Sequence, residues 1–187
     1  MATDPALLVL MYFVMPLWLA AGFADWLCHR ATRIESTTGA KESLIHLLMF
    51  VEVGAPLLAV LFLQVNAGIL SLMIVAFFIH ELTALWDVSY AVSAREVGPV
   101  EQHLHSFLEM VPLMAMLLVI SRHWGQFLAL FGFGRETAAY ALAWKRQALP
   151  AGYLACILLL ILVFELAPYT EELWRCLRRR GDQQTGL

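Results

Sequence analysis

Charged residues are scarce in this sequence. Only 14% of its 187 residues are Asp, Glu, Lys or Arg, whereas 61% are hydrophobic, and the mean hydropathy is +0.73. A soluble domain carries about a quarter charged residues, so this composition excludes a water-facing globule. The net charge of −3 supplies no basic field, and we expect no nucleic-acid partner. Lipid must be the main solvent of the chain.

Cysteine is equally scarce, and its spacing excludes a disulfide framework. Cys28, Cys156 and Cys176 form no Cys-x-x-Cys pair and lie in or beside apolar runs, so we expect them to pack as small apolar side chains. A dinucleotide-binding fold is not indicated either, because Gly132-Phe133-Gly134 follows no predicted strand.

Long apolar runs dominate the remaining sequence and predict an all-α integral membrane protein with about five transmembrane helices. We expect a single transmembrane domain over residues 1–187, with a four-helix bundle core and a fifth, C-terminal span. The runs approach the ~20 residues needed to cross ~30 Å of hydrocarbon. The predicted spans cover residues 5–28, 42–65, 68–90, 100–121 and 151–174, with an interfacial segment at 122–149 and a basic tail at 175–187.

Lys and Arg are divided unevenly between the two predicted membrane faces. The face with the first loop, the third loop and the C-terminal tail, called side A, receives eight of them, and the opposite face, side B, receives four. The positive-inside rule makes side A cytoplasmic. We therefore expect a protein of a bacterial inner membrane, with its N-terminus outside and its C-terminus in the cytoplasm.

One spacing of acid and histidine recurs at the side A ends of the spans. Residues four apart lie about 40° apart around a helix, so such a pair presents an oxygen and a nitrogen to one point. With six histidines and 15 carboxylates among 187 residues, chance gives about half of one such pair, and the sequence has three. The three pairs are Asp25–His29, Glu42–His46 and Glu101–His105.

Further ligand-type residues extend this cluster, since His80 and Asp87 share a face of the third span and Glu109 follows His105 by four residues. Antiparallel helices that direct Glu and His inward build the di-iron and di-manganese sites of four-helix bundles. We therefore expect two divalent metal ions, iron first, with zinc or manganese as alternatives. The predicted metal ligands are Asp25, His29, Glu42, His46, His80, Asp87, Glu101, His105 and Glu109.

Three more carboxylates lie deeper in the predicted spans. An ionisable group within hydrocarbon is costly and indicates function by default. We expect Glu52, Glu81, Glu165 and Tyr169 to support the metal ligands, by fixing histidine tautomers or by carrying protons. Glu172 shares a helix face with Glu165 and Tyr169.

The expected function is a membrane-embedded di-iron oxidoreductase of the hydroxylase or desaturase type. It would act on a lipid-like or isoprenoid substrate at the cytoplasmic face, with a soluble reductant. The His-x-x-x-His and His-x-x-His-His motifs of membrane desaturases and hydroxylases are absent, and so is the Glu-x-x-His of soluble di-iron bundles. The assignment therefore follows from ligand type and not from family membership, and it favours an enzyme without requiring one.

Three other functions stay open at this point. A zinc-dependent membrane lipid hydrolase would use zinc-activated water, with the extra glutamates as acid–base groups. A membrane electron carrier would hold haem between histidines on facing helices, although haem needs no carboxylates nearby. A divalent-metal or proton transporter is disfavoured because the sequence shows no inverted repeat.

Overall fold

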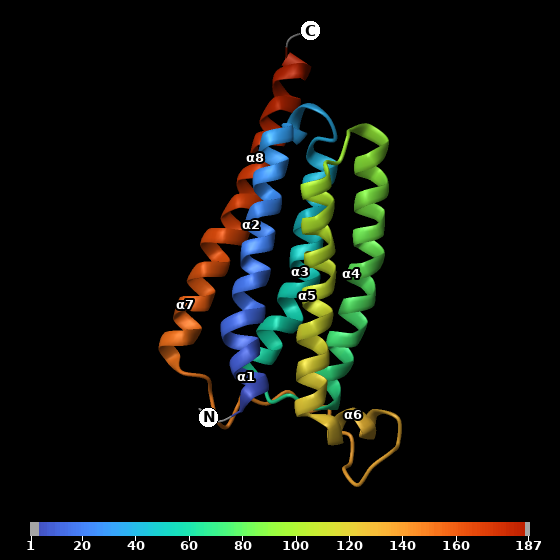
Figure 1. The fold of residues 1–187 in the computed structure, drawn as a ribbon, viewed down its shortest axis with the longest axis vertical. Helices are drawn as coiled ribbons and strands as arrows, with labels where there is room; N and C mark the ends of the chain where they lie inside the picture. Colours follow the sequence, from blue (N-terminus) through green and yellow to red (C-terminus); the bar gives the residue numbers. More distant parts are fainter. Residues whose placement is uncertain (1–3, 186–187) are drawn as a thin grey trace.

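Five long helices run alternately up and down between the two ends of an elongated bundle (Figure 1). A computed structural model describes residues 4–185, with side chains described as far as Gly181. Within residues 4–185 the fold is all-helical, and the one β contact is an isolated bridge between Leu63 and Trp144. The first loop, the third loop and the C-terminal end lie together at side A, and residues 122–150 cross the opposite end, side B (Figure 1).

The helix bounds fall close to the predicted spans. The first long helix, Pro5–Thr32, comprises α1 (Pro5–Val9), a π-helical turn η1 (Leu10–Val14) and α2 (Met15–Thr32). The next three are α3 (Ala40–Phe62), α4 (Ala67–Ala94) and α5 (Pro99–Arg122). The last comprises α7 (Ala151–Ile161), a second π-helical turn η3 (Leu162–Leu166) and α8 (Ala167–Thr185). Two short helices, η2 (Ile34–Ser36) and α6 (Trp124–Leu130), lie in the connections.

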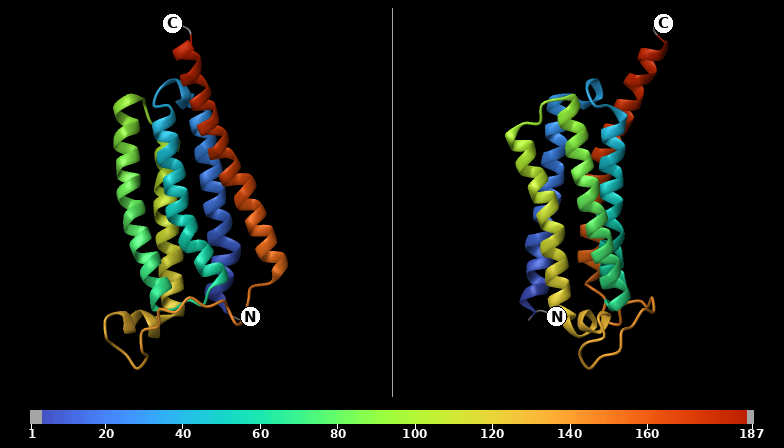
Figure 2. Two further views of the ribbon diagram at one scale, coloured as in Figure 1. Left: turned by 180° about the vertical axis from the view of Figure 1, so that it is seen from behind. Right: turned by 90° about the vertical axis from the view of Figure 1, so that its right-hand side faces the viewer.

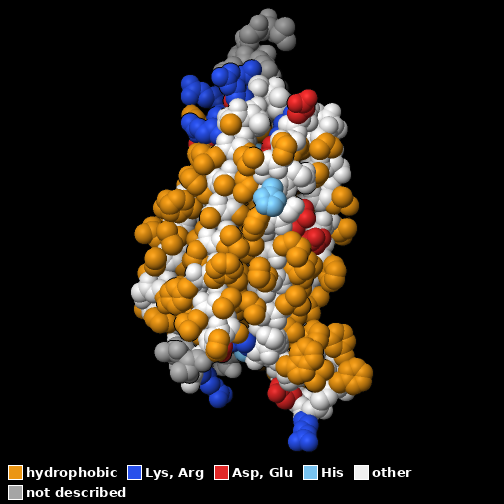
Figure 3. All heavy atoms as spheres, viewed as in Figure 1, with side chains coloured by type: hydrophobic (Ala, Val, Ile, Leu, Met, Phe, Trp, Pro, Cys, Tyr) orange, Lys and Arg blue, Asp and Glu red, His pale blue; other side chains and the backbone are white. Residues whose placement is uncertain are grey.

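All five long helices are long and apolar enough to cross a membrane, which confirms the predicted number. The shortest has 23 residues, about 35 Å at 1.5 Å per residue, against ~30 Å of hydrocarbon. Tyr12, Leu82 and Leu117 are more than half exposed on the outside of the bundle. Figure 3 shows this apolar surface along the helices, with Lys and Arg gathered at the two ends. Such a surface suits lipid and not water.

At side A the helices extend beyond the predicted span ends. The first reaches Thr32, and α8 continues through the segment predicted to be a basic tail. Arg30 forms an ion pair with Glu171 at 2.8 Å, and Arg175 pairs with Glu35. Hydropathy marks where the hydrocarbon ends and not where the helix ends, so the sequence places these boundaries too early.

The segment at residues 122–149 is helical only in α6. Beyond it, the chain crosses side B in an extended path tied to the turn between α3 and α4. The Gln64 amide donates to the Ala143 carbonyl at 2.8 Å, and the Lys145 amide donates to the Phe62 carbonyl at 2.9 Å. These bonds satisfy backbone groups that the end of α3 leaves free, and they hold Lys145 under the bundle.

The interior divides into an apolar half and a polar half. Helix α2 packs along α5, α3 along α4, and α8 against both α3 and α2 (Figure 2). Val14, Leu61 and Val111 belong to an apolar core toward side B. The fifth span is more than an addition to a four-helix core, because α8 carries Glu172 into the polar half near side A.

Candidate metal centre

Carboxylates and imidazoles from all five long helices fill the interior near side A. Each is at most 7% exposed, although these groups are normally hydrated. Each carboxylate comes from a helix different from that of at least one histidine it faces, so the bundle's packing assembles the cluster. Its members are Asp25 and His29 on α2, Glu42 and His46 on α3, Asp87 on α4, Glu101 and His105 on α5, and Glu172 on α8.

A first group joins α2 and α5. Asp25, His29, Glu101 and His105 each offer one ligand atom, and these atoms all lie within 4.8 Å of one another. The His29 Nε2 atom is 3.3 Å from Asp25 Oδ2 and 3.4 Å from Glu101 Oε1. The His105 Nε2 atom is 3.1 Å from Asp25 Oδ1. Two imidazoles and two carboxylates thus converge as a metal site requires.

A second group lies beside the first and joins α2 and α3. Ligand atoms of His29, Glu42 and His46 also lie within 4.8 Å of one another. The His46 Nε2 atom is 3.4 Å from Asp87 Oδ2 and 3.9 Å from Glu42 Oε1. The His46 ring stacks on the His29 ring, with centroids 4.4 Å apart and an interplanar angle of 9°. The two groups therefore share His29 and form one cluster.

Glu172 fixes the orientation of both stacked rings. Its Oε2 atom is 3.0 Å from His29 Nδ1, and its Oε1 atom is 2.9 Å from His46 Nδ1. An ionised carboxylate only accepts hydrogen bonds, so both Nδ1 atoms donate, and in the neutral rings both Nε2 atoms then keep a lone pair. Carboxylates hold metal-bound histidines in this way. Neither Nε2 atom has a hydrogen-bond partner among the described residues, although both are buried. The donor set thus fits metal ions at both Nε2 atoms.

Arg95 connects the two groups at their side A edge. Its guanidinium donates to Glu42 at 2.5 and 3.3 Å, and to Glu101 at 3.0 Å from Nη1 and also from Nη2. Burial alone would lower the pKa of Arg95, but the bonds to Glu101 and Glu42 raise it further above its ordinary value. In the sequence, Arg95 is one of the eight Lys and Arg residues that predict the orientation. The available signal was its place in a short loop between two helices whose side A ends carry acids.

The cluster carries an excess of negative charge. With carboxylates ionised and histidines neutral, five buried carboxylates and the Arg95 guanidinium leave four negative charges. Unpaired charges in a buried site cost several kcal/mol each. Two divalent ions would bring the sum to zero.

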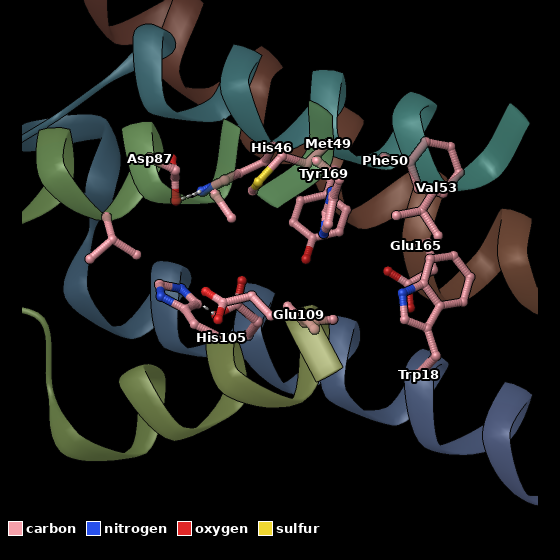
Figure 4. Close-up of a pocket in the computed structure, with 15 residues that line it drawn as sticks. Trp18, His46, Met49, Phe50, Val53, Asp87, His105, Glu109, Glu165 and Tyr169 are labelled. Atoms are coloured by element: carbon pink, nitrogen blue, oxygen red, sulfur yellow. Dashed lines mark ion pairs between the residues drawn. The ribbon is translucent and has the colours of Figure 1, made fainter. Parts of the chain in front are cut away.

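His80, Glu109, Glu52 and Glu81 lie outside both groups. His80 and Glu109 line a cavity of about 60 Å³ that opens beside the cluster, where Asp87, His46 and His105 lie at one end (Figure 4). The His80 Nδ1 atom faces Glu52 Oε2 at 3.6 Å, and Glu52 accepts from the Thr83 hydroxyl at 2.8 Å. Glu81 does not line this cavity. Their assignment as ligands or supporting residues stays a prediction.

Glu165 and Tyr169 line the same cavity from the fifth span (Figure 4). Tyr169 donates its hydroxyl to the Gly22 carbonyl at 3.2 Å. Glu165 lies in the η3 π-turn, and such turns are frequent at functional sites. Its carboxylate packs so closely against Gly22 that an added Cβ would come within 2.3 Å of it. The helix face predicted to fix histidine tautomers does so through Glu172, whereas Tyr169 bonds to backbone.

Comparison with protein families, with curated proteins and with solved structures finds no match for this chain.

Proposed function

We propose that this chain is a membrane-embedded dinuclear metalloprotein, with iron as the expected metal, that oxidises a lipid-like substrate. The observation that carries the proposal is the double contact of Glu172. A single buried carboxylate that holds the Nδ1 atoms of two stacked imidazoles leaves two Nε2 atoms free, each directed at carboxylates of a different helix.

Two ions would divide the ligands of the cluster between them. His29, His105, Asp25 and Glu101 would hold one ion, and His46, Glu42 and Asp87 the other. The 4.4 Å between the His29 and His46 ring centroids is compatible with the separation of about 3.5–4 Å found in two-metal sites. Arg95 would keep Glu42 and Glu101 in place, because a guanidinium holds carboxylates in a fixed orientation.

Mixed imidazole and carboxylate ligands favour iron or manganese, and a pair of iron ions supplies redox chemistry with dioxygen. In a hydroxylation, one oxygen atom enters a C–H bond and the other leaves as water, with two electrons and two protons from a reductant. Glu165 and Glu109 line the cavity beside the cluster and would carry those protons. The apolar side chains of the same cavity, Trp18, Phe50 and Val53, would exclude water from the substrate.

The same proposal includes an orientation. With side A in the cytoplasm, as eight against four Lys and Arg residues favour, the metal centre lies within reach of a soluble cytoplasmic reductant. The N-terminus would then lie outside a bacterial inner membrane. Reactivity of single introduced cysteines toward an impermeant thiol reagent in intact cells tests this arrangement.

Metal analysis of the detergent-purified chain tests the proposal. We expect two iron ions per chain in the wild type and fewer in His46→Ala and His105→Ala. His103→Ala is the matched control, because His103 is exposed on the same helix as His105. Full metal content in both cluster variants would refute the site.

The same preparation separates the alternative functions. If the chain holds only zinc and consumes no oxygen in the presence of a reductant, the metal site stands, but the proposed reaction becomes hydrolysis instead of oxidation. A haem absorption band would refute the dinuclear site. The stacking of His29 on His46 already leaves no gap for a porphyrin between those two rings.

A further inference from the structure

A larger cavity of about 150 Å³ occupies the other half of the bundle interior, toward side B. All five long helices line it, mostly with apolar side chains, among them Leu10, Val60, Phe77 and Val119. Its few polar lining groups are confined to its two ends. Glu52 and His80 lie at the end toward the metal centre, and Arg122, His123 and Lys145 lie at side B.

The two cavities meet in the middle of the bundle. Trp18, Val53 and His80 line both of them. Along α5 the path from Arg122 to His105 covers about 25 Å at 1.5 Å per residue, of which about 15 Å lies between Arg122 and Pro112. One acyl chain covers about half of the ~30 Å hydrocarbon core, so a single chain matches the lower cavity in length.

Local sequence features keep this space open. Pro56 and Pro112 both line the cavity, and proline inside a helix removes a hydrogen bond and bends the axis. Residues of the η1 π-turn also line the cavity, and Ala76 and Ala115 contribute only a methyl group each. An empty apolar cavity destabilises a fold, so an apolar occupant is favoured.

The side B end of the cavity carries excess positive charge. Arg122 forms an ion pair with Asp4 at 2.8 Å, whereas no carboxylate of the described residues lies within ion-pair distance of the Lys145 ammonium. Burial and the neighbouring Arg122 lower the pKa of Lys145. Burial likewise lowers the pKa of His123, so this imidazole adds no charge near neutral pH. This end of the cavity, called its mouth, thus carries one positive charge in excess, on the half-buried Lys145.

We propose that this cavity binds a single-chain amphiphile with an anionic head, a fatty-acid carboxylate in its simplest form. The head lies against Lys145 and Arg122, and the chain points along the bundle axis toward His80 and the metal centre. Binding requires only the cavity and its cationic mouth. That the bound chain is the substrate rests on the proposed function, and it implies oxidation at carbons remote from the head.

Photolabelling of the full chain in phosphatidylcholine nanodiscs tests the binding and its direction. Two palmitate probes are used, with a diazirine either at the far end of the chain or next to the carboxylate. We expect the far-end probe to label residues 52–57 and 76–80, and the head-proximal probe to label residues 119–123 and 145–153. The reverse pattern, or equal labelling of the outer surface by both probes, would overturn the proposal.

Two variants with matched controls test the contacts. Ala115→Trp fills the cavity and abolishes labelling, whereas Leu117→Trp, on the exposed side of the same helix, does not. Lys145→Gln weakens competition by unlabelled palmitate about tenfold, which is the effect of losing one charge-assisted hydrogen bond. Arg146 lines neither cavity, so Arg146→Gln leaves this competition unchanged. Hexadecanol should compete no better with the wild type than palmitate does with Lys145→Gln. Equal competition by palmitate and hexadecanol in the wild type would overturn the role of the head.

Metal content, oxygen consumption and labelling are measured on the same preparation, so that the two proposals fail separately. Labelling of the cavity in a chain that binds no metal would refute the proposed function and leave the binding site intact. A chain that holds two iron ions and consumes oxygen, but whose cavity takes no label, would refute this inference alone.

Discussion

Replacing Glu172 by Gln removes one acceptor from the most buried part of the cluster with almost no change in volume. Glu172 is fully buried and accepts from His29 Nδ1 at 3.0 Å and from His46 Nδ1 at 2.9 Å. A glutamine offers one carbonyl oxygen and one NH₂ group, so it can accept from only one of the two rings. The other imidazole then faces a donor, must become protonated at Nε2, and loses its lone pair for a metal ion.

The magnitude follows from this loss. Removal of a group that orients a metal-bound histidine costs about 10–100-fold in metal affinity, or about 1.4–2.8 kcal/mol. The substitution also removes one of the four net negative charges, so two divalent ions leave the site with a positive charge. We therefore expect one ion to be lost preferentially, so that Glu172→Gln holds close to one ion at metal concentrations where the wild type holds two.

Equilibrium dialysis against a competing chelator, followed by element analysis, measures both affinities. The matched control is Glu171→Gln, because Glu171 is the preceding residue, its side chain is 33% exposed, and it pairs with Arg30 at the surface. Thermal unfolding of both variants checks that the fold is kept. If a folded Glu172→Gln bound two ions as tightly as Glu171→Gln does, the assignment of both Nε2 atoms as ligands would be wrong.

Three further predictions concern residues around this centre. Arg95→Gln should lower the unfolding free energy of the metal-free chain by about 3–5 kcal/mol, because it leaves two buried carboxylates without their guanidinium partner. Arg95→Lys should have an intermediate effect. Equal melting temperatures for the Gln and Lys variants would contradict the bidentate contacts of Arg95 with Glu42 and Glu101. His80→Asn should keep both ions, since His80 faces Glu52 outside the two ligand groups, and loss of an ion on element analysis would restore it as a ligand. The Leu7 amide, followed by Arg122, lowers the pKa of Asp4, so its stabilising contribution is present above its ordinary value of 3.8 and is lost as the pH falls through the lowered pKa. Protection of the Leu7 amide from hydrogen exchange should therefore fall over this acid range in the wild type. In Asp4→Asn it should show no such acid-dependent fall.

The number of helices and the location of the cluster at one end could be predicted from the sequence because both depend on local quantities. Hydropathy adds along the chain, and even the least apolar of the five long helices, Pro99–Arg122, contains enough apolar residues to cross the hydrocarbon. The four-residue spacing of Asp25 and His29 places both on one helix face wherever that helix packs. Glu52 lies about 120° around α3 from His46, and its carboxylate accepts from Thr83, outside both ligand groups.

The pairing within the cluster could not be predicted, because it depends on how each helix is rotated and displaced against its neighbours. The sequence pairs Asp25 with His29, four residues away on the same helix. The shortest histidine contact of Asp25, at 3.1 Å, is however to His105 on α5. His80 shares a helix face with Asp87, but it lies seven residues, about 10 Å, farther along α4 from side A, so it faces Glu52 and not the cluster.

Glu172 and Arg95 show what only the tertiary structure decided. In the sequence, Glu172 is one of three polar residues on a helix face, and Arg95 is one of eight basic residues at side A. The packing of α8 against both α2 and α3 brings the Glu172 carboxylate to two rings at once, and the short loop after α4 places Arg95 over Glu42 and Glu101. Composition and periodicity determined that a polar, buried cluster must exist, since they fix helices and faces. Long-range packing determined which nitrogen faces which oxygen, since a ligand contact changes with an ångström of displacement that leaves helix periodicity untouched.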